Sequence, residues 1–189
     1  YYGDVVMIKT QLLVIGSGPG GYAAAFRAAD LGKEVTLVET HDSLGGVCLN
    51  VGCIPSKSLL HTAEVINEAK HAGELGISFS SPKIDIDAVR KNKEGIVNKL
   101  TGGIQALAKA RKVQVIKGYA KFLSQNQATL EGSDEVIEFE NCIIAAGSKV
   151  TKLPMFPFDD SRVMDSTDAL LLDEIPKRLL VVGGGIIGQ

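Results

Sequence analysis

Two short segments near the start of the chain are mostly apolar, and a helical pattern lies between them. Residues 11–15 are an apolar, partly β-branched run that stops at Gly16, which predicts a buried parallel strand. Residues 19–31 are rich in alanine and end at Gly32, as helices often do. Residues 34–38 form the second run. The order of these segments predicts a βαβ unit.

Two longer segments further along the chain have apolar residues at helical spacing. They are residues 56–70 and residues 84–112, and we expect the second helix to be interrupted at Gly102 and Gly103. Further apolar runs predict strands at residues 113–116, 119–123, 127–130, 136–139, 142–146 and 179–182. Short polar turns join the second, third and fourth of these runs, which is typical of a small antiparallel meander.

The same glycine pattern, Gly-x-Gly-x-x-Gly, follows an apolar run twice. The first copy is Gly16, Gly18 and Gly21, and the second copy is Gly183, Gly185 and Gly188, one residue before the sequence ends. Because a domain does not end on the first turn of a nucleotide-binding unit, we expect the chain to be a piece of a longer protein. We interpret residues 1–8 as an N-terminal extension or a remnant of expression.

The first glycine pattern stands in the context that a dinucleotide site requires. It follows a predicted strand and opens a predicted helix, and Glu39 stands 18 residues after Gly21 at the end of the next strand. Gly16 permits a tight turn, Gly18 leaves room for a pyrophosphate, and Gly21 lets the helix pack against the strand. The helix N-terminus attracts phosphates, and Glu39 would accept hydrogen bonds from ribose hydroxyls. The alternative is a glycine turn in an unrelated α/β fold.

Composition and charge exclude several classes of protein. The sequence has 20 Lys and Arg and 22 Asp and Glu, which gives a net charge of −2. It has no cluster of basic residues of the kind that binds nucleic acids. The longest apolar runs are too short to cross a membrane, and the start of the chain has no basic segment of the kind that opens a signal peptide. With 45% hydrophobic residues, we expect a soluble, cytoplasmic α/β protein.

Two of the three cysteines, Cys48 and Cys53, lie five positions apart after a glycine-rich segment. Either thiol could be a small buried hydrophobe, and a zinc site would need two more ligands, which His41 and His61 do not supply at metal-site spacing. The third interpretation is a redox-active dithiol. On a regular helix the two Cα atoms would be about 8 Å apart, whereas a disulfide needs about 7 Å or less. We therefore expect a distorted segment, which Gly52 permits.

Residues 45–57 read Gly-Gly-Val-Cys-Leu-Asn-Val-Gly-Cys-Ile-Pro-Ser-Lys. This motif resembles the active-site signature of the FAD-dependent pyridine nucleotide-disulfide oxidoreductases, and within them it is most similar to the dihydrolipoamide dehydrogenases, the E3 components of 2-oxo acid dehydrogenase complexes. The resemblance covers nearly the whole chain from about Lys9, with further matches at residues 100–104, 141–148 and 183–188.

The resemblance implies an α/β fold with two cofactors. Residues 9–150 would form the first part of a Rossmann-like FAD-binding domain, with a parallel sheet, helices and a small meander. Residues 151–189 would form a connection and the start of a Rossmann-like NAD-binding domain. The residues implied in cofactor binding are Gly16, Gly18, Pro19, Gly20, Gly21, Glu39, Thr40, Gly45, Gly46, Val47, Cys48, Cys53, Lys57, Ala120, Ala145, Ala146, Gly147 and Ser148 for FAD, and Gly183, Gly185 and Gly188 for NAD.

The resemblance also implies an activity, the oxidation of protein-bound dihydrolipoamide with NAD⁺ as acceptor. Cys48 would exchange with the lipoyl group, Cys53 would lie beside the flavin, and Lys57 would lie near flavin N5. Two positions depart from the family's usual residues, because Ala120 stands where glycine is common and Ala146 where threonine is common.

The implied partners are lipoyl domains, the E2 core of the complexes and a second copy of the intact protein. The family's catalytic His-Glu pair belongs to a C-terminal region that this sequence lacks, so we expect the chain alone to be inactive. Two alternatives stay open. One is another FAD-dependent reductase, of the glutathione or mercuric type, and the other is a non-catalytic FAD-binding module.

Overall fold

The computed structural model describes residues 6–188, so most of the predicted extension at residues 1–8 lies outside the described residues. The chain divides into two compact units. Unit 1 contains Tyr1–Asn50 and Lys99–Ser148, and unit 2 contains Val51–Asn98 and Lys149–Gln189. No helix among the described residues is both long and apolar enough to cross a membrane.

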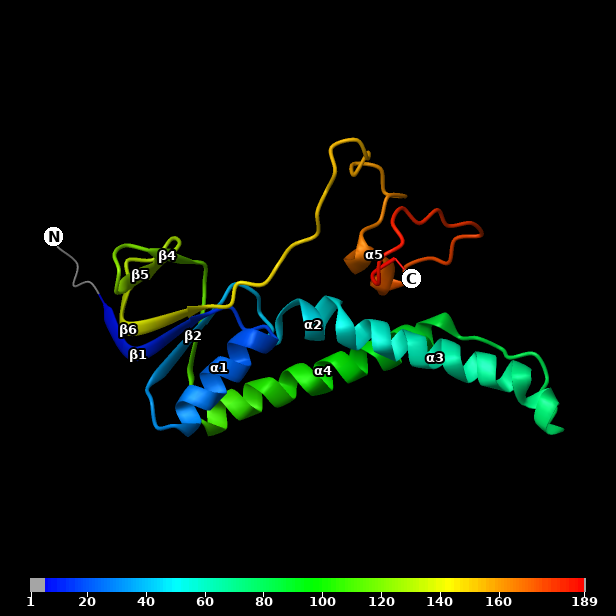
Figure 1. Cartoon of the computed structure of the whole chain (residues 1–189), viewed down its shortest axis with the longest axis horizontal. Coiled ribbons are helices and arrows are strands. Elements are labelled where there is room, and N and C mark those ends of the chain that lie inside the picture. Colours follow the sequence, from blue (N-terminus) through cyan, green and yellow to red (C-terminus); the bar gives the residue numbers. More distant parts are fainter. Residues whose placement is uncertain (1–5, 189) are drawn as a thin grey trace. The chain divides into compact units, whose positions relative to one another are not determined.

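Unit 1 is built on a six-stranded mixed sheet (Figure 1). Its strands are β1 (Met7–Ile15), β2 (Val35–Glu39), β3 (Gln114–Lys117), β4 (Ala120–Phe122), β5 (Gln127–Leu130) and β6 (Val136–Ile144). They lie in the order β3-β2-β1-β6-β5-β4. The first four strands in that order are parallel, and β5 pairs antiparallel with both β6 and β4. The predicted α/β class, with a parallel sheet and an antiparallel meander, is therefore confirmed.

The helices are α1 (Pro19–Asp30), α2 (Gly46–Val51), α3 (Cys53–His71), a 3₁₀ turn η1 (Ala72–Leu75), α4 (Ile86–Ala110) and α5 (Ser166–Leu171). The three predicted helices are present as α1, α3 and α4, and the structure adds α2, α5 and one 3₁₀ turn that were not predicted. In unit 1, α1 lies beside the sheet and presents the small residues Ala25 and Ala28 to it. Because alanine adds little bulk, the helix packs close to the strands that precede and follow it.

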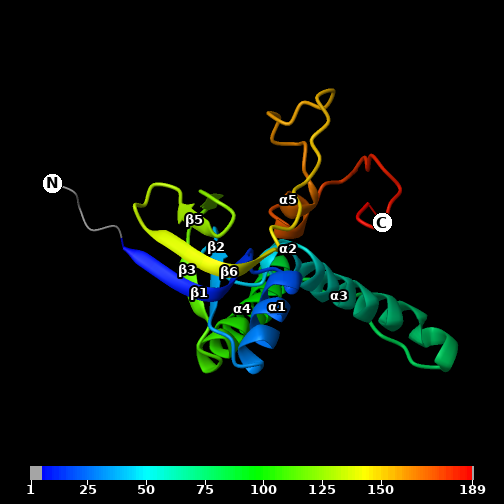
Figure 2. The same cartoon turned by 60° about the vertical axis from the view of Figure 1, so that its left-hand side comes forward.

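Alternate residues of β1 face opposite sides of the sheet and enter two separate apolar clusters. Leu12 and Val14 pack with Leu37 on the side covered by α1, whereas Leu13 packs with Ile137 on the other side. Strand β1 pairs with β2 on one side and with β6 on the other, and Figure 2 shows β1 and β6 side by side. A parallel strand covered on both faces is apolar throughout, which explains the unbroken run that predicted it.

Three predictions about single elements are wrong. The two predicted strands at residues 136–139 and 142–146 are one strand, β6, which ends at Ile144, because pairing with β1 along its length carries the strand through the polar Glu140. Helix α4 continues through Gly102 and Gly103, since a glycine costs a helix only about 1 kcal/mol relative to alanine. Residues 179–182 are not a strand, because no described strand pairs with them.

Candidate functional site

The turn between β1 and α1 requires glycine at two of its positions. Gly16 has a φ of +95°, and a Cβ there would lie 2.3 Å from the carbonyl oxygen of Ala145. A Cβ on Gly21 would lie 1.8 Å from the oxygen of Gly16. Helix α1 then begins at Pro19 with Gly18 as its N-cap, and no side chain caps its first N–H groups. The turn therefore leaves backbone donors at a helix N-terminus available for an anion.

The segment that follows β2 packs directly against this turn. A Cβ on Gly46 would lie 2.6 Å from the Cα of Gly18, and Gly45 has a φ of +106°. The N–H of Gly45 donates to the backbone oxygen of Ser17 over 3.0 Å. Two glycine-rich segments nearly 30 residues apart are thus held in contact at the start of α1 and of α2.

Glu39 ends β2 and is only 6% exposed. Its Oε2 accepts hydrogen bonds from the backbone N–H of Ser17 (2.9 Å) and the hydroxyl of Ser17 (2.5 Å). Its Oε1 accepts from the hydroxyl of Thr40 (3.1 Å) and the N–H of His41 (2.9 Å). Burial raises the pKa of the Glu39 carboxyl, but these hydrogen bonds outweigh it and the net pKa is lowered. Glu39 is therefore a buried, ionised carboxylate.

Ser17 is a functional candidate that the sequence reasoning missed. It is fully buried, and it connects the glycine turn, the carboxylate of Glu39 and the N–H of Gly45. The only sequence signal is a small hydroxyl residue inside Gly-x-Gly, and its meaning depends on an acid 22 positions away.

The other residues predicted for FAD lie at different distances from the turn. The N–H of Ala145 donates to Ile15 over 2.7 Å, and its Cβ lies 3.5 Å from the Cβ that Gly21 would carry. Ala145 therefore lines the turn. Gly147 adopts a φ of +72° three residues beyond β6. Ala120 begins β4 and pairs with Leu130, so no described contact joins it to the turn.

The two cysteines of the motif lie on consecutive helices. Cys48 is half-buried in α2, and Cys53 is the exposed first residue of α3. Gly52 separates the helices with φ −142° and ψ −112°, so the expected distortion is confirmed at that residue. No disulfide joins the cysteines among the described residues.

Helix α2 is fixed to the segment before it by Asn50 and Leu49. The amide of Asn50 donates to the backbone oxygens of Leu44 (3.2 Å) and Gly46 (2.9 Å). Leu49 is 6% exposed, and a Cβ on Gly45 would lie 2.7 Å from its side chain. These contacts fix the backbone that carries Cys48 close to the glycine turn in unit 1.

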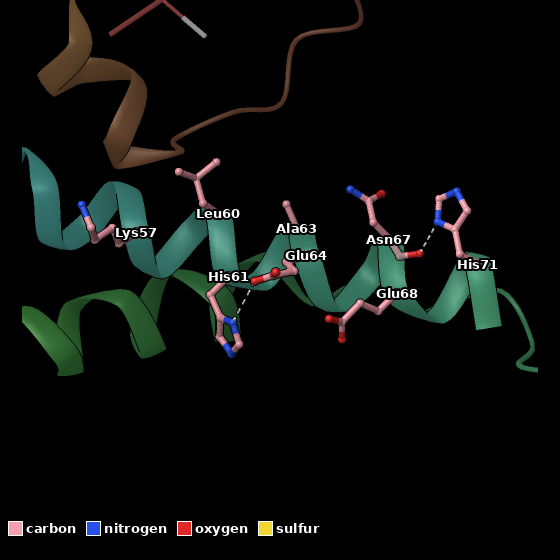
Figure 3. Close-up of a pocket in the computed structure, with 8 residues that line it drawn as sticks. All are labelled: Lys57, Leu60, His61, Ala63, Glu64, Asn67, Glu68 and His71. Carbon is pink, nitrogen blue, oxygen red and sulfur yellow. Dashed lines mark hydrogen bonds and ion pairs between the residues drawn. The ribbon is translucent and has the colours of Figure 1, made fainter. Parts of the chain in front are cut away.

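Lys57, the last residue of the cysteine motif, lies on an open face of α3 (Figure 3). All eight residues that line this shallow surface come from the same helix. His61 lies 3.6 Å from Glu64, and the ring of His71 lies 2.8 Å from the backbone oxygen of Asn67. Among the described residues no other element lines this face, so its shape adds no support to the predicted role of Lys57.

The second glycine pattern repeats the local geometry of the first. Gly183 has a φ of +111°, and a Cβ on Gly188 would lie 2.5 Å from the oxygen of Gly183. Gly188 donates its N–H to the oxygen of Gly185 over 3.0 Å. No strand or helix flanks this turn among the described residues.

Comparisons with known proteins agree with the motifs. The sequence profile of the family described as "Pyridine nucleotide-disulphide oxidoreductase" matches residues 10–189. The chain is 57% identical to the dihydrolipoyl dehydrogenase of Haemophilus influenzae over 184 residues, and 56% identical to that of Vibrio cholerae over 183. Each match covers 96% of this chain and 38% of the relative, so the chain spans well under half the length of these relatives.

A solved structure has the same fold. It is the "HOCl-induced flavoprotein disulfide reductase RclA from Escherichia coli", with a TM-score of 0.80 and 29% sequence identity. The match covers 94% of this chain and 38% of that one.

Proposed function

Because the chain belongs to the pyridine nucleotide-disulphide oxidoreductase family, we propose that the whole protein is a dihydrolipoyl dehydrogenase, in which Cys48 and Cys53 form the redox-active pair. The observation that carries this proposal is the pair itself, placed on two consecutive helices with Gly52 between them. The identity of 57% to a dihydrolipoyl dehydrogenase supports the same assignment.

The glycine turn of unit 1 fits FAD. Gly18 has no side chain to exclude a pyrophosphate, the start of α1 is uncapped by side chains, and the ionised Glu39 suits ribose hydroxyls. The remaining residues predicted from the resemblance for FAD belong to the same proposal. When bound, FAD would supply the hydride chemistry between the dithiol and a nicotinamide.

The two cysteines would exchange with the substrate by thiolate attack. A thiolate of dihydrolipoamide attacks Sγ of Cys48 in the Cys48–Cys53 disulfide, and Cys53 leaves as a thiolate. The second lipoyl thiolate then attacks the lipoyl sulfur of this mixed disulfide and releases Cys48. The lipoyl group leaves as a disulfide, and the cysteine pair has gained two electrons.

The remaining predictions from the resemblance belong to this proposal as well. NAD⁺ would bind at Gly183, Gly185 and Gly188, and the partners would be lipoyl domains, the E2 core of 2-oxo acid dehydrogenase complexes and a second copy of the protein. The location would be the cytoplasm. These statements concern the whole protein, because the present chain matches only 38% of the length of the Haemophilus influenzae relative.

Anaerobic titration of the full-length protein with dihydrolipoamide tests the proposal. We expect a bound-flavin spectrum that gains a long-wavelength charge-transfer band at two electrons, and that returns to its starting form when NAD⁺ is added. Cys53→Ser should abolish the band. Cys142→Ser is the matched control, because Cys142 lies half-buried in β6, outside the motif. A protein that carries no flavin would overturn the proposal.

A second candidate is a disulfide reductase with another substrate. The fold shared with a flavoprotein disulfide reductase at a TM-score of 0.80 supports it, since this fold serves more than one such enzyme. Flavin reduction by NADPH, together with no response to dihydrolipoamide, would favour this candidate.

A further inference from the structure

The carboxylate of Glu39 has no open acceptor position in the structure. Each carboxylate oxygen can accept about two hydrogen bonds, and each already accepts two from the protein. A ribose hydroxyl can therefore bind Glu39 only if one of the present donors gives way. The backbone N–H groups of Ser17 and His41 are fixed by the chain, so the choice lies between the hydroxyls of Ser17 and Thr40.

The surroundings of the two hydroxyls differ. Ser17 is fully buried, and its oxygen accepts the N–H of Gly45 over 3.3 Å, which directs its own proton toward Glu39 Oε2. Thr40 is exposed, and its hydroxyl reaches Oε1 of the adjacent residue over 3.1 Å. An exposed hydroxyl can rotate to water at little cost, whereas a buried one that loses its acceptor stays unpaired.

We propose that Ser17 is a positioning residue for the adenosine ribose of FAD. Its hydroxyl holds Oε2 of Glu39 in place, and Oε1 then accepts a hydrogen bond from a ribose hydroxyl in place of the one from Thr40. The inference rests on the proposed function, because it requires FAD at the first glycine turn. Ser17 acts through Glu39 and does not itself contact the ribose in this arrangement. Thr40 occupies the place that the ribose hydroxyl takes.

Ser17 also connects Glu39 to the start of α2, the helix that carries Cys48. Its backbone oxygen and its hydroxyl both accept the N–H of Gly45, the residue before α2. Ser17→Ala removes the hydrogen bond from the hydroxyl to Glu39 but keeps the bond from the Gly45 N–H to the backbone oxygen of residue 17. We therefore expect the variant to affect the Glu39 carboxylate more than the backbone at Gly45. This separation makes the variant informative.

The first experiment measures FAD binding to the flavin-free full-length protein by titration calorimetry. Ser17→Ala should weaken FAD binding about tenfold, the loss expected for one charge-assisted hydrogen bond. Thr40→Val should strengthen it about threefold, because the ribose no longer competes with a hydroxyl. Thr10→Val is the matched control, because Thr10 is buried in β1 and its hydroxyl donates only to the backbone oxygens of Leu12 and Glu34.

The second experiment repeats the titration with an FAD analogue whose adenosine ribose lacks both hydroxyls. If Ser17 acts through the ribose, Ser17→Ala and the unmodified protein should bind this analogue equally. If Ser17→Ala loses the same factor of affinity for FAD and for the analogue, the role of Ser17 is purely structural and the inference is overturned. A Thr40→Val variant that binds FAD tenfold more weakly would also overturn it. Ser17→Cys, which keeps a weak donor, provides the same comparison if Ser17→Ala does not fold.

These outcomes separate the inference from the proposed function. If the unmodified full-length protein does not bind FAD, the proposed function is wrong. If it binds FAD and only the Ser17 comparison fails, the proposed function stands and the inference alone is overturned.

Discussion

Residues 16–21 and residues 183–188 make the same backbone turn in different surroundings. In both, the first glycine has a φ near +100°, and the last glycine lies too close to the first for a Cβ. The first turn joins β1 to α1 and lies against Glu39 and Gly46. The second turn has no flanking strand or helix among the described residues.

The difference between these turns shows that the glycine motif determines the backbone turn, whereas a binding site also needs groups from other parts of the chain. The motif is sufficient for the local turn, because the absence of Cβ atoms decides it. The carboxylate of Glu39 and the glycines at 45 and 46 come from less than 30 residues further along the chain, whereas Ala145, which also lines the turn, comes from about 130 residues further along. Among the described residues, only the first turn has a buried carboxylate and a flanking helix beside it.

The largest expected effect comes from replacing the closing glycines. Gly21→Ala places a Cβ 1.8 Å from the oxygen of Gly16, so the turn must open, and we expect a loss of about 3 kcal/mol or more in the free energy of unfolding. Gly188→Ala in this chain also forces its turn to shift, but no described strand or helix packs against that exposed turn, so we expect a change of less than about 0.5 kcal/mol. Urea denaturation of both variants measures this, and equal losses would contradict the comparison.

A second pair of variants compares the segments that precede the two turns. Leu13 is fully buried in β1, so Leu13→Ala should cost about 2–5 kcal/mol of unfolding free energy. Leu180 is 86% exposed in the corresponding segment before Gly183, so Leu180→Ala should cost less than about 0.5 kcal/mol. A large loss for Leu180→Ala in urea denaturation would mean that residues 179–182 are packed in solution.

The pH dependence of unfolding tests the carboxylate at the first turn. The pKa of Glu39 is lowered in the folded protein, since its hydrogen bonds outweigh its burial. Its contribution to stability is therefore present above the carboxyl's ordinary pKa and is lost as the pH falls through the lowered value.

Ser17→Ala removes one of those bonds, so acid unfolding should begin at a higher pH, with a loss of about 1 kcal/mol at neutral pH. Thermal melts from neutral to acidic pH measure both effects. Lys117→Met is the control, because Lys117 pairs with the exposed Asp42 and lowers the pKa of that carboxyl instead. If acid unfolding of Ser17→Ala begins at the same pH as in the unmodified protein, the hydrogen bond from the Ser17 hydroxyl to Glu39 does not lower the pKa of that carboxyl.

The smallest effect is expected for the exposed ion pair in unit 2. Arg162 bonds to Asp160 and holds the pKa of that carboxyl well below its ordinary range, yet the Arg162 side chain is exposed and that of Asp160 is only partly buried. Exposed pairs contribute little because solvent screens them. Arg162→Ala should therefore leave the thermal melting temperature and its pH dependence unchanged, and a shift comparable to that of Ser17→Ala would contradict this expectation.

Sequence patterns predicted the elements whose signal is local. The βαβ unit at the start of the chain follows from apolar runs and glycine stops, and the meander follows from its short polar turns. β6 was divided wrongly, since Glu140 lies exposed in a strand that is held by pairing with β1, which is remote in sequence. The same limit explains Ser17, because its role depends on Glu39 and Gly45.

Hydrogen exchange on the flavin-free full-length protein tests the central claim most directly. The account predicts that FAD slows exchange at the amides of residues 17–22 and 39–46 and leaves residues 183–188 unchanged. NAD⁺ should slow exchange at residues 183–188 instead. Protection by FAD at the second turn, or none at the first, would contradict the claim that the glycine turn beside Glu39 is the flavin site.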